Sequence, residues 1–486
     1  MDEPDHRKIA DNVVQLDQYQ PVDASDISLS EQFAEEYKHN LRYVGQWSKW
    51  FHFNGMNWDM DHKMRVYTLC KYMLRKLARK QLKWSMENEL KQIDPSSDSY
   101  RSQRTVAKGK ALGTIAHFKT AKKVASVVWL ARSDKSLALG IDEWDADPWL
   151  LNTPQGVVDL RTGSVRQARA TDYMTMIAGA GPSNMPRPRW EEFMKQITDG
   201  DSGLASYMQR VLGYCLTGHT GEHAMFFGFG TGANGKSVLL NTIGKLMGDY
   251  HKSTAMETFI LTNEYRHPTE LAGLRGARMV TASETQKGRK WDEVKVKRLT
   301  GGDPINARFM RQDFFEFYPQ FKLFIVGNNK PSLNTVDEAM RRRFNLIPFT
   351  VTIPEHKRNP HLVEELEPEW PGIMSWMLEG CLEFQNKGLQ APQSVKEATE
   401  TYMSMEDGFT AWWSECVTIN PLGFTRVSDA YDSWKKWASK SGDIPGGSKE
   451  FSQTLLARAD ILKIKYFKSN EGRGFRGMSI PALPTK

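Results

Sequence analysis

Residues 228–243 read GFGTGANGKSVLLNTI, and no other stretch constrains the fold as strongly. The part from Gly230 to Ser237 fits the pattern G-x-x-x-x-G-K-[ST] in full. A short apolar run, AMFFGF, precedes the loop, and an amphipathic run, SVLLNTIGKLMGD, follows it. A strand, a glycine loop and a helix in this order predict an α/β sheet with its chemistry at the strand ends.

The residue types of this loop suit a bound polyphosphate. Glycines allow consecutive backbone N–H groups to point inward and form a nest for an anion, and the helix that begins at Lys236 adds its positive end. Lys236 would supply charge to the β- and γ-phosphates, and Ser237 would offer a hydroxyl to Mg²⁺. We therefore predict ATP and Mg²⁺ as cofactors. The predicted binding residues are Gly230, Gly232, Asn234, Gly235, Lys236 and Ser237.

The chain of 486 residues is too long for one ordinary hydrophobic core. Two further apolar runs after the loop, ARMVTASE and FKLFIVGNN, predict buried strands of the same sheet. The tail carries two amphipathic helical runs, then strand, glycine-rich basic turn and strand, which is the outline of a winged helix. The predicted parts are a flexible lead at 1–30, a mainly helical domain at 31–190, the ATPase domain at 191–355, a helical extension at 356–420 and a winged-helix domain at 421–486.

Several classes of protein are disfavoured by the sequence. No apolar stretch approaches the roughly 20 residues that span a bilayer, and the acidic, polar N-terminus is not typical of a secretory signal. The four cysteines are far apart and form no CxxC pair, which fits a reducing cytoplasm. His219 and His223 lie in GHTGEH, where a loop is favoured over a zinc site, and the DxD runs at 59–61 and 145–147 are interpreted as structural.

Basic residues crowd together between Lys63 and Lys123. Basic helices of this kind favour a polyanionic partner, although a charge run is more often a solvated helix face. The tail is also basic, with Lys463, Lys465, Lys468, Arg473 and Arg476 on and around the predicted wing. Such a wing could contact the DNA backbone or dock a protein.

The motif order resembles the superfamily 3 helicases of viruses, phages and plasmids. The loop with Asn234, the segment KRLTGGDPINARFMRQDFFEFYPQFKLFIVGNNKP (297–331) and the segment DEAMRRRFNLIPF (337–349) are similar to the phage and plasmid primase-helicase C-terminal module, also found in the poxvirus primase-helicase. Upstream, WSKWFHFNGMNWDMD and DADPWLLNTPQGVVDLRTG resemble the helical domain before that motor. The resemblance implies an AAA+-like P-loop motor that forms a hexamer.

The resemblance implies roles for residues at two strand ends. Glu284 ends the strand RMVTASE, expected beside the phosphate-loop strand, and would polarise the attacking water and support Mg²⁺. Ser283 lies where such motors often have a second acidic residue, so Glu284 would act both as the catalytic base and as the support for Mg²⁺. Asn328 matches the position that senses the γ-phosphate, with Asn329 as the adjacent alternative. A strand-end glutamate and a turn asparagine are the structural alternatives.

Two further segments receive roles from the resemblance. The run Arg341, Arg342 and Arg343 would supply an arginine finger to a neighbouring subunit, at Arg342 or Arg343, with the other arginines structural. The segment ARFMRQDFFEF is expected to form a hairpin at 307–317 that grips single-stranded nucleic acid through Lys297, Arg308 and Arg311. Phe309 and Phe314 could stack on bases, but the alternation of FFEFYPQF favours a core position for most of its rings.

The sequence therefore predicts a DNA helicase of phage, plasmid or prophage replication, moving 3′→5′ as a hexameric ring in the cytoplasm of a bacterial host. The expected partners are single-stranded and forked DNA, further copies of the chain, and a separate primase or polymerase, because too few residues precede the helical domain for primer synthesis. The alternative is an origin-binding initiator in which ATP only sets assembly. A packaging or defence ATPase is a third reading.

Overall fold

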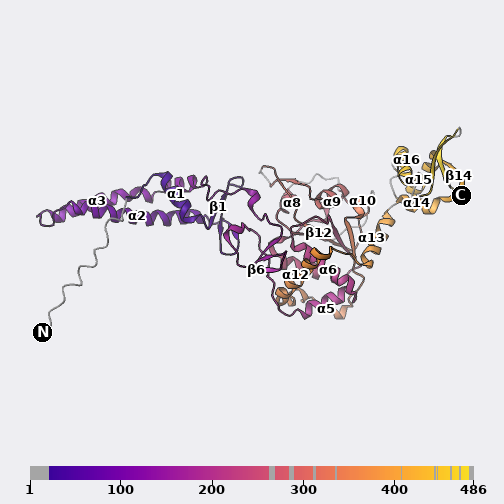
Figure 1. The fold of residues 1–486 in the computed structure, drawn as a ribbon, viewed down its shortest axis with the longest axis horizontal. Helices are drawn as coiled ribbons and strands as arrows, with labels where there is room; N and C mark the ends of the chain where they lie inside the picture. The colour runs from indigo at the N-terminus through magenta and orange to yellow at the C-terminus, as the bar shows by residue number, and fades with distance from the viewer. Residues whose placement is uncertain are drawn as a thin grey trace. The chain divides into compact units, whose positions relative to one another are not determined.

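The computed structural model describes residues 21–261, 269–283, 289–309, 313–333, 336–406, 408–442, 445, 447–459, 462–469 and 472–480. Two compact units divide the chain. The first unit comprises the residues up to Asp147 with Asn152–Val157 and Arg166–Ile177, and the second comprises the remainder. Both units are drawn in Figure 1.

The first unit combines four helices with a small antiparallel sheet among its described residues. Its elements are α1 (Asp26–Tyr37), β1 (Leu41–Val44), β2 (Lys49–Phe53), β3 (Trp58–Met60), α2 (Arg65–Lys91), α3 (Tyr100–Ile115) and α4 (Ala121–Ala131). The sheet has the order β1-β2-β3. Helix α1 begins at Asp26, inside the segment predicted as a lead, because Ser25 caps it by accepting a hydrogen bond from the Ser28 N–H.

Helices α2 and α3 form a long antiparallel hairpin (Figure 1). Asp61 fixes the start of α2, since its carboxylate accepts hydrogen bonds from the N–H groups of Arg65 and Val66 at 2.8 and 2.9 Å. The apolar positions of α2 recur at helical spacing, and Val66, Cys70, Met73, Leu74 and Ala78 are buried in the core of the unit.

Between residues 148 and 177, consecutive short segments of the chain belong alternately to the second and the first unit. This stretch contains the strands β4 (Leu150–Thr153), β5 (Gly156–Asp159) and β6 (Ser164–Arg166), which form a sheet of order β4-β5-β6. Turns at 154–155 and 160–163 flank β5.

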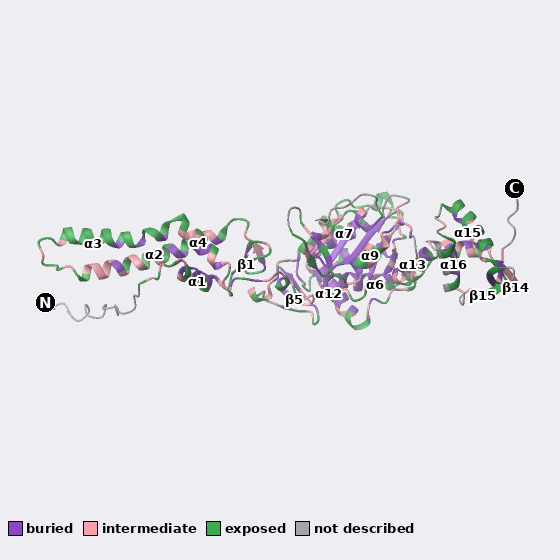
Figure 2. Cartoon of the chain, turned by 90° about the horizontal axis from the view of Figure 1, so that it is seen from above, coloured by how far each residue is buried: buried purple, intermediate pink, exposed green. Residues whose placement is uncertain are grey.

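The second unit is built on a parallel sheet of five strands in the order β13-β7-β12-β9-β8. These strands are β7 (Met225–Phe229), β8 (His251–Ser253), β9 (Met279–Ser283), β12 (Lys322–Gly327) and β13 (Phe344–Pro348). All six residues of β12 are buried, as expected for a strand covered on both faces. Figure 2 shows the sheet as the buried centre of this unit. The α/β prediction and the three buried strands AMFFGF, ARMVTASE and FKLFIVGNN are confirmed.

Helices surround this sheet. They are α5 (Pro188–Ile197), α6 (Ser202–Leu216), α7 (Lys236–Met247), α8 (Thr269–Ala272), α9 (Glu293–Thr300), α10 (Glu338–Arg341), α11 (Leu362–Glu365), α12 (Trp370–Lys387) and α13 (Gln393–Glu406). Helix α13 packs on the edge strand β13, where Thr399 Oγ1 accepts a hydrogen bond from the Leu346 N–H at 2.9 Å. The Tyr402 hydroxyl of α13 accepts a hydrogen bond from Trp291 Nε1 at 3.0 Å, deep in the core.

The C-terminal segment folds around its own apolar cluster of Phe409, Trp412, Trp434, Phe451 and Phe475 with their neighbours. Its elements are α14 (Gly408–Cys416), β14 (Thr418–Arg426), α15 (Val427–Ser441), α16 (Ser448–Ala457), β15 (Lys465–Ser469) and β16 (Gly472–Ser479), with the sheet order β14-β16-β15. The predicted pair of helices and the following two strands are present.

Candidate nucleotide site

The carboxyl ends of four parallel strands meet at one edge of the large sheet. Phe229 at the end of β7 lies opposite Pro348 of β13 and Gly327 of β12, and Ser283 of β9 lies opposite Val326. The residues that follow these strands therefore gather at this edge. They include the glycine loop after β7 and Asn328 after β12.

One expectation about this edge is wrong. The strand that leads to Glu284 does not lie beside the phosphate-loop strand, because β12 lies between β9 and β7. An apolar run identifies a buried strand but carries no information on its neighbours, which are set by the crossover connections. Asn328 thus follows the strand directly next to β7. Glu284 itself lies outside the described residues, as does Arg311.

The glycine loop is shaped by close backbone approaches. A Cβ at Gly230 would lie 2.1 Å from the Asn234 side-chain nitrogen and 2.3 Å from the Phe349 carbonyl oxygen. Gly235 has φ 82° and its Cβ would lie 2.5 Å from Ile197 Cγ2. Both positions therefore require glycine. The loop turns sharply and delivers Lys236 and Ser237 to the first turn of α7.

Lys236 is buried, although it carries a charge. Its Nζ donates hydrogen bonds to the Gly230 carbonyl oxygen at 2.9 Å and to Asn234 Oδ1 at 2.8 Å. Both acceptors are neutral, and burial lowers the pKa of Lys236. A buried cation with only neutral acceptors in the described structure, at the positive end of a helix, fits an anionic ligand.

Asn234 links this loop to the next strand. Its side chain is only 2% exposed, and its Nδ2 donates a hydrogen bond to the Phe349 carbonyl oxygen at 3.2 Å, just after β13. Its Oδ1 at the same time accepts from Lys236. The sequence indicated Asn234 by its motif position, but not this bridging role. Ser237 is exposed next to Lys236, where its hydroxyl could reach a magnesium ion.

A cavity of about 380 Å³ adjoins the loop. It is lined by Phe229, Gly230, Thr231, Lys330, Leu346, Pro348, Phe349, Thr350 and Ala398. Lys330 Nζ lies 4.3 Å from the centroid of the Phe229 ring, and burial lowers the pKa of this lysine. Lys330 was not among the predicted site residues. Its position just after the two asparagines of GNNKP was the available signal.

The three consecutive arginines differ in their surroundings. Arg341 pairs with Glu400 at 2.8 Å. Arg343 is 7% exposed, and its guanidinium donates to Thr300 Oγ1 at 3.1 Å and to the Ala339 carbonyl oxygen at 2.9 Å. Burial lowers the pKa of Arg343. Arg342 is exposed at the surface.

The expected hairpin is present as β10 (Ile305–Ala307) and β11 (Phe315–Phe317), which pair antiparallel. Arg308 lies on it with its guanidinium carbon 4.7 Å from the Phe314 ring centroid. Lys297 lies on α9, where it forms an ion pair with Asp337.

The aromatic rings of FFEFYPQF divide between core and surface: Phe317 and Phe321 are buried and Phe315 packs against the core, so most of the five rings lie there, as the alternation predicted. Phe309, Phe314 and Tyr318 are 41%, 57% and 70% exposed, whereas Phe317 and Phe321 are buried. The exposed rings of Phe309 and Phe314 are therefore the ones that could stack on bases.

The two histidines of GHTGEH make separate contacts. His219 stacks on the Trp149 ring at 5.6 Å, and burial lowers the pKa of His219. His223 Nδ1 lies 2.9 Å from the Thr300 carbonyl oxygen. Within the described ranges, no group of three or more His, Cys, Asp and Glu side chains is placed to hold a metal ion.

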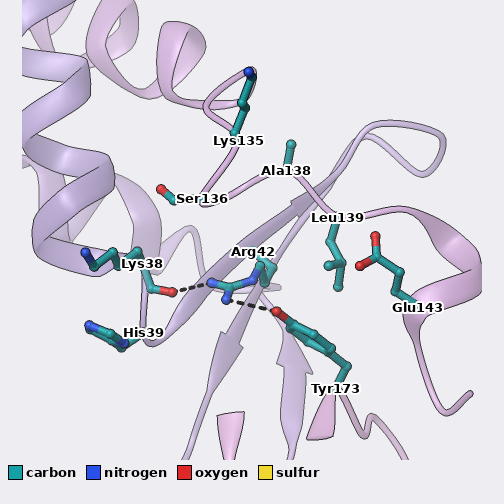
Figure 3. Close-up of a pocket in the computed structure, with 9 residues that line it drawn as sticks. All are labelled: Lys38, His39, Arg42, Lys135, Ser136, Ala138, Leu139, Glu143 and Tyr173. Atoms are coloured by element: carbon teal, nitrogen blue, oxygen red, sulfur yellow. Dashed lines mark hydrogen bonds between the residues drawn. The ribbon is translucent and has the colours of Figure 1, made fainter. Parts of the chain in front are cut away.

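A second cavity, of about 330 Å³, lies in the first unit (Figure 3). Its central side chain, Arg42, donates hydrogen bonds to the carbonyl oxygens of Lys38 and Leu41 and to the Tyr173 hydroxyl. The guanidinium carbon also lies 5.2 Å from the Trp58 ring centroid. Arg42 therefore joins β1 to the end of α1, which indicates a structural role.

No helix among the described residues is long and apolar enough to cross a bilayer.

Comparisons with known proteins agree with this architecture. Residues 30–199 match the family described as D5 N terminal like, and residues 229–343 match a family of unknown function, DUF5906. A proposed helicase of Acanthamoeba polyphaga mimivirus is 26% identical over 60% of the chain and 33% of its own length. Proposed helicases of Frog virus 3 and Invertebrate iridescent virus 3 are each 26% identical, over 49% and 46% of the chain and 27% and 25% of their own lengths.

The chain thus spans a third or less of these curated relatives. Two structures of the NrS-1 C-terminal region match 94% of the chain and 99% or 100% of their own, with a TM-score of 0.52 and 10% identity, which shows a shared fold. The match of residues 30–199 to the D5 N terminal like family confirms the resemblance to the poxvirus primase-helicase.

Proposed function

We propose that this protein is an ATP-dependent DNA helicase that acts in phage, plasmid or prophage replication. The observation that carries the proposal is the buried Lys236, held by neutral oxygens in a glycine loop at the carboxyl edge of a parallel sheet. That arrangement suits a nucleoside triphosphate with Mg²⁺. The viral relatives named as proposed helicases support the choice of helicase among the ATPases.

The proposed nucleotide site uses groups from two strand ends and α7. Lys236 would leave Gly230 and Asn234 to contact the β- and γ-phosphates, and Ser237 would bind Mg²⁺. Asn328, exposed after β12, would orient the attacking water. Glu284 keeps its proposed role as base and metal support.

A neighbouring copy would complete the site. Among the three arginines, Arg342 is the proposed finger. Arg341 pairs with Glu400, and the buried guanidinium of Arg343 donates hydrogen bonds within its own subunit. A finger that acts between copies implies a closed ring, for which we propose a hexamer. The ring would be an AAA+-like motor, flanked by the mainly helical N-terminal domain and the C-terminal winged helix, with the domain boundaries given by the sequence.

The DNA would pass the β10–β11 hairpin. We propose that Arg308 and Arg311 contact phosphates there, with Lys297 nearby, and that movement along the single strand is 3′→5′. The partners would be single-stranded and forked DNA with a separate primase or polymerase, in the cytoplasm of a bacterial host.

The test is unwinding of forked DNA by the purified chain. The wild type should separate the strands only with ATP and Mg²⁺, and hydrolyse ATP faster when single-stranded DNA is added. The variants Lys236→Ala and Glu284→Gln should bind the fork but leave it paired. Unwinding by Glu284→Gln at the wild-type rate would contradict the motor.

A second candidate, an ATP-regulated initiator that binds an origin, is favoured by the basic helices outside the P-loop unit. Such a protein would show ATP-dependent assembly on duplex DNA without strand separation by the wild type. The same experiment therefore separates the two functions.

A further inference from the structure

We propose that the outer face of α2 binds single-stranded nucleic acid, at a site distinct from the β10–β11 hairpin. The site is named here the α2 stripe and comprises Lys71, Tyr72, Arg75, Lys76, Arg79 and Lys80. The proposal does not depend on ATP hydrolysis, so it can hold or fail independently of the motor.

Basic and acidic residues are separated along the α2–α3 hairpin. Residues 62–86 contain eight lysines and arginines and no acidic residue, and residues 99–133 again contain eight and none. The connecting segment, 87–98, carries four acidic residues and one lysine. A solvated helix face normally alternates its charges, so this separation points to a polyanion along the two helices.

The cations of the α2 stripe are exposed to solvent. All six residues of the α2 stripe are exposed, and they lie opposite the buried positions Cys70, Met73, Leu74 and Ala78. Lys76 lies 3.4 Å from Glu36. Among the residues that the structure describes, no ion pair forms with Lys71, Arg75, Arg79 or Lys80. Four cations of the stripe therefore remain available to phosphates.

The α2 stripe is long enough to contact several phosphates of one strand. Lys83 pairs with Glu87 at 4.0 Å and Lys110 of α3 pairs with Glu89 at 3.6 Å, so the available charge ends where the acidic connection begins. From Lys71 to Lys80 the helix rises about 14 Å. A strand with at least about 3.4 Å between phosphates places up to about four phosphates along that length.

Tyr72 selects the single strand over the duplex. Its side chain is 65% exposed, on the side of α2 that faces away from the core. In a helix it neighbours Arg75 and Lys76, three and four residues on. An exposed aromatic ring among cations can stack on an unpaired base while the cations contact the backbone, whereas the bases of a duplex are already stacked.

The experiment measures binding of a fluorescent oligothymidylate by anisotropy at several salt concentrations, without nucleotide. The stripe variant carries Lys71→Gln, Arg75→Gln, Arg79→Gln and Lys80→Gln. The matched control carries Lys49→Gln, Lys135→Gln, Lys195→Gln and Lys357→Gln, all exposed elsewhere. Each set removes four positive charges and lowers the formal net charge from +7 to +3.

The stripe variant should bind at least about tenfold more weakly at low salt, and the slope of log affinity against log salt should become shallower by about 3, since each lost phosphate contact contributes about 0.7. Both sets should keep the wild-type helical circular dichroism and the DNA-free ATPase rate. Equal affinity and equal salt slope for the two sets would overturn the proposal.

Tyr72 variants test the choice of strand. Tyr72→Ala should weaken oligothymidylate binding by about tenfold and leave binding of a duplex of equal length unchanged, while Tyr72→Phe should bind as the wild type. An equal loss on both DNA forms, or no loss on either, would overturn the single-strand assignment. The two proposals can be told apart. If the stripe variant binds oligothymidylate more weakly but the wild type unwinds no forked DNA, the helicase proposal is wrong and the α2 stripe proposal stands.

Discussion

At the scale of single residues, the nucleotide loop depends on one buried amide. Asn234 accepts a hydrogen bond from Lys236 and donates one to the Phe349 carbonyl, so it fixes the lysine and ties the loop to the end of β13. Preorganisation of this kind lowers the cost of ordering the loop around a ligand. Loss of the Asn234 side chain should therefore mainly weaken the affinity for ATP.

Asn234→Ala should raise the KM for ATP about tenfold, which corresponds to about 1.4 kcal/mol, with a smaller change in kcat. Steady-state ATP hydrolysis with saturating single-stranded DNA measures both constants. Asn359→Ala, at an exposed site, is the control and should match the wild type. A tenfold loss of kcat at unchanged KM would show that Asn234 acts in the chemical step instead.

A second residue with a distinct environment is Lys322, at the start of β12. Its Nζ donates hydrogen bonds to the carbonyl oxygens of Thr217, His219 and Gln320. Burial, helped by the nearby Arg278, lowers the pKa of Lys322 to about 7, while Cys215 and Cys381 oppose the shift. In the unfolded chain the pKa of a lysine is about 10.4.

Between pH 7 and about 10.4 the unfolded state therefore binds more protons at Lys322 than the folded state, and stability must rise with pH. This contribution is at most about 1.4 kcal/mol per pH unit. Urea unfolding of the protein, measured from pH 7 to 8.5, should give a free energy of unfolding that rises with pH in the wild type. In Lys322→Met this free energy should depend less on pH. Parallel profiles for the two proteins would contradict the assignment.

At the scale of elements, the sequence predicted the parts whose signals are local. The runs that became β7, β9 and β12 are mainly apolar, and the glycine pattern fixed the start of α7, so these elements followed from composition and spacing. The small sheet of β1, β2 and β3 was not predicted. Its aromatic-rich sequence falls in a region that was read as helical, because helix and strand patterns cannot be told apart over runs so short.

Long β14 was also missed, because its sequence TINPLGFTR shows no clear alternation of apolar and polar residues, and its first five residues are exposed. The position of β12 between β7 and β9 could not be predicted for a different reason, because strand order depends on contacts between distant segments. For the same reason the sequence could not distinguish Arg342 from Arg343, whose partner Thr300 lies on α9.

The β10–β11 hairpin allows a test at this scale. Arg308→Ala should lower DNA stimulation of ATP hydrolysis and the unwinding rate by about tenfold, because it removes a cation held against the exposed Phe314 ring. The DNA-free hydrolysis rate should stay unchanged, since Arg308 lies on the hairpin and not in the glycine loop. Arg298→Ala, exposed on α9, is the matched control. Equal losses in both variants would show that general charge, not the hairpin, mediates the response.

At the scale of the whole molecule, the proposed mechanism requires that two copies of the chain share each nucleotide. The glycine loop and Asn328 belong to one copy, and Arg342 is proposed to belong to the next. A site divided in this way can be repaired by mixing two defective proteins, because a copy with an intact loop can receive an intact finger from its neighbour. A site contained in one copy cannot be repaired.

The most direct measurement is therefore ATP hydrolysis by a mixture of Lys236→Ala and Arg342→Ala, each inactive alone, assembled together on single-stranded DNA. Random mixing should restore both groups at roughly a quarter of the interfaces. The control mixture of Lys236→Ala and Ser237→Ala, both defective in the loop, should stay inactive. Recovered hydrolysis in the first mixture alone is the predicted result. Hydrolysis that remains at the level of the separate variants would contradict the shared site.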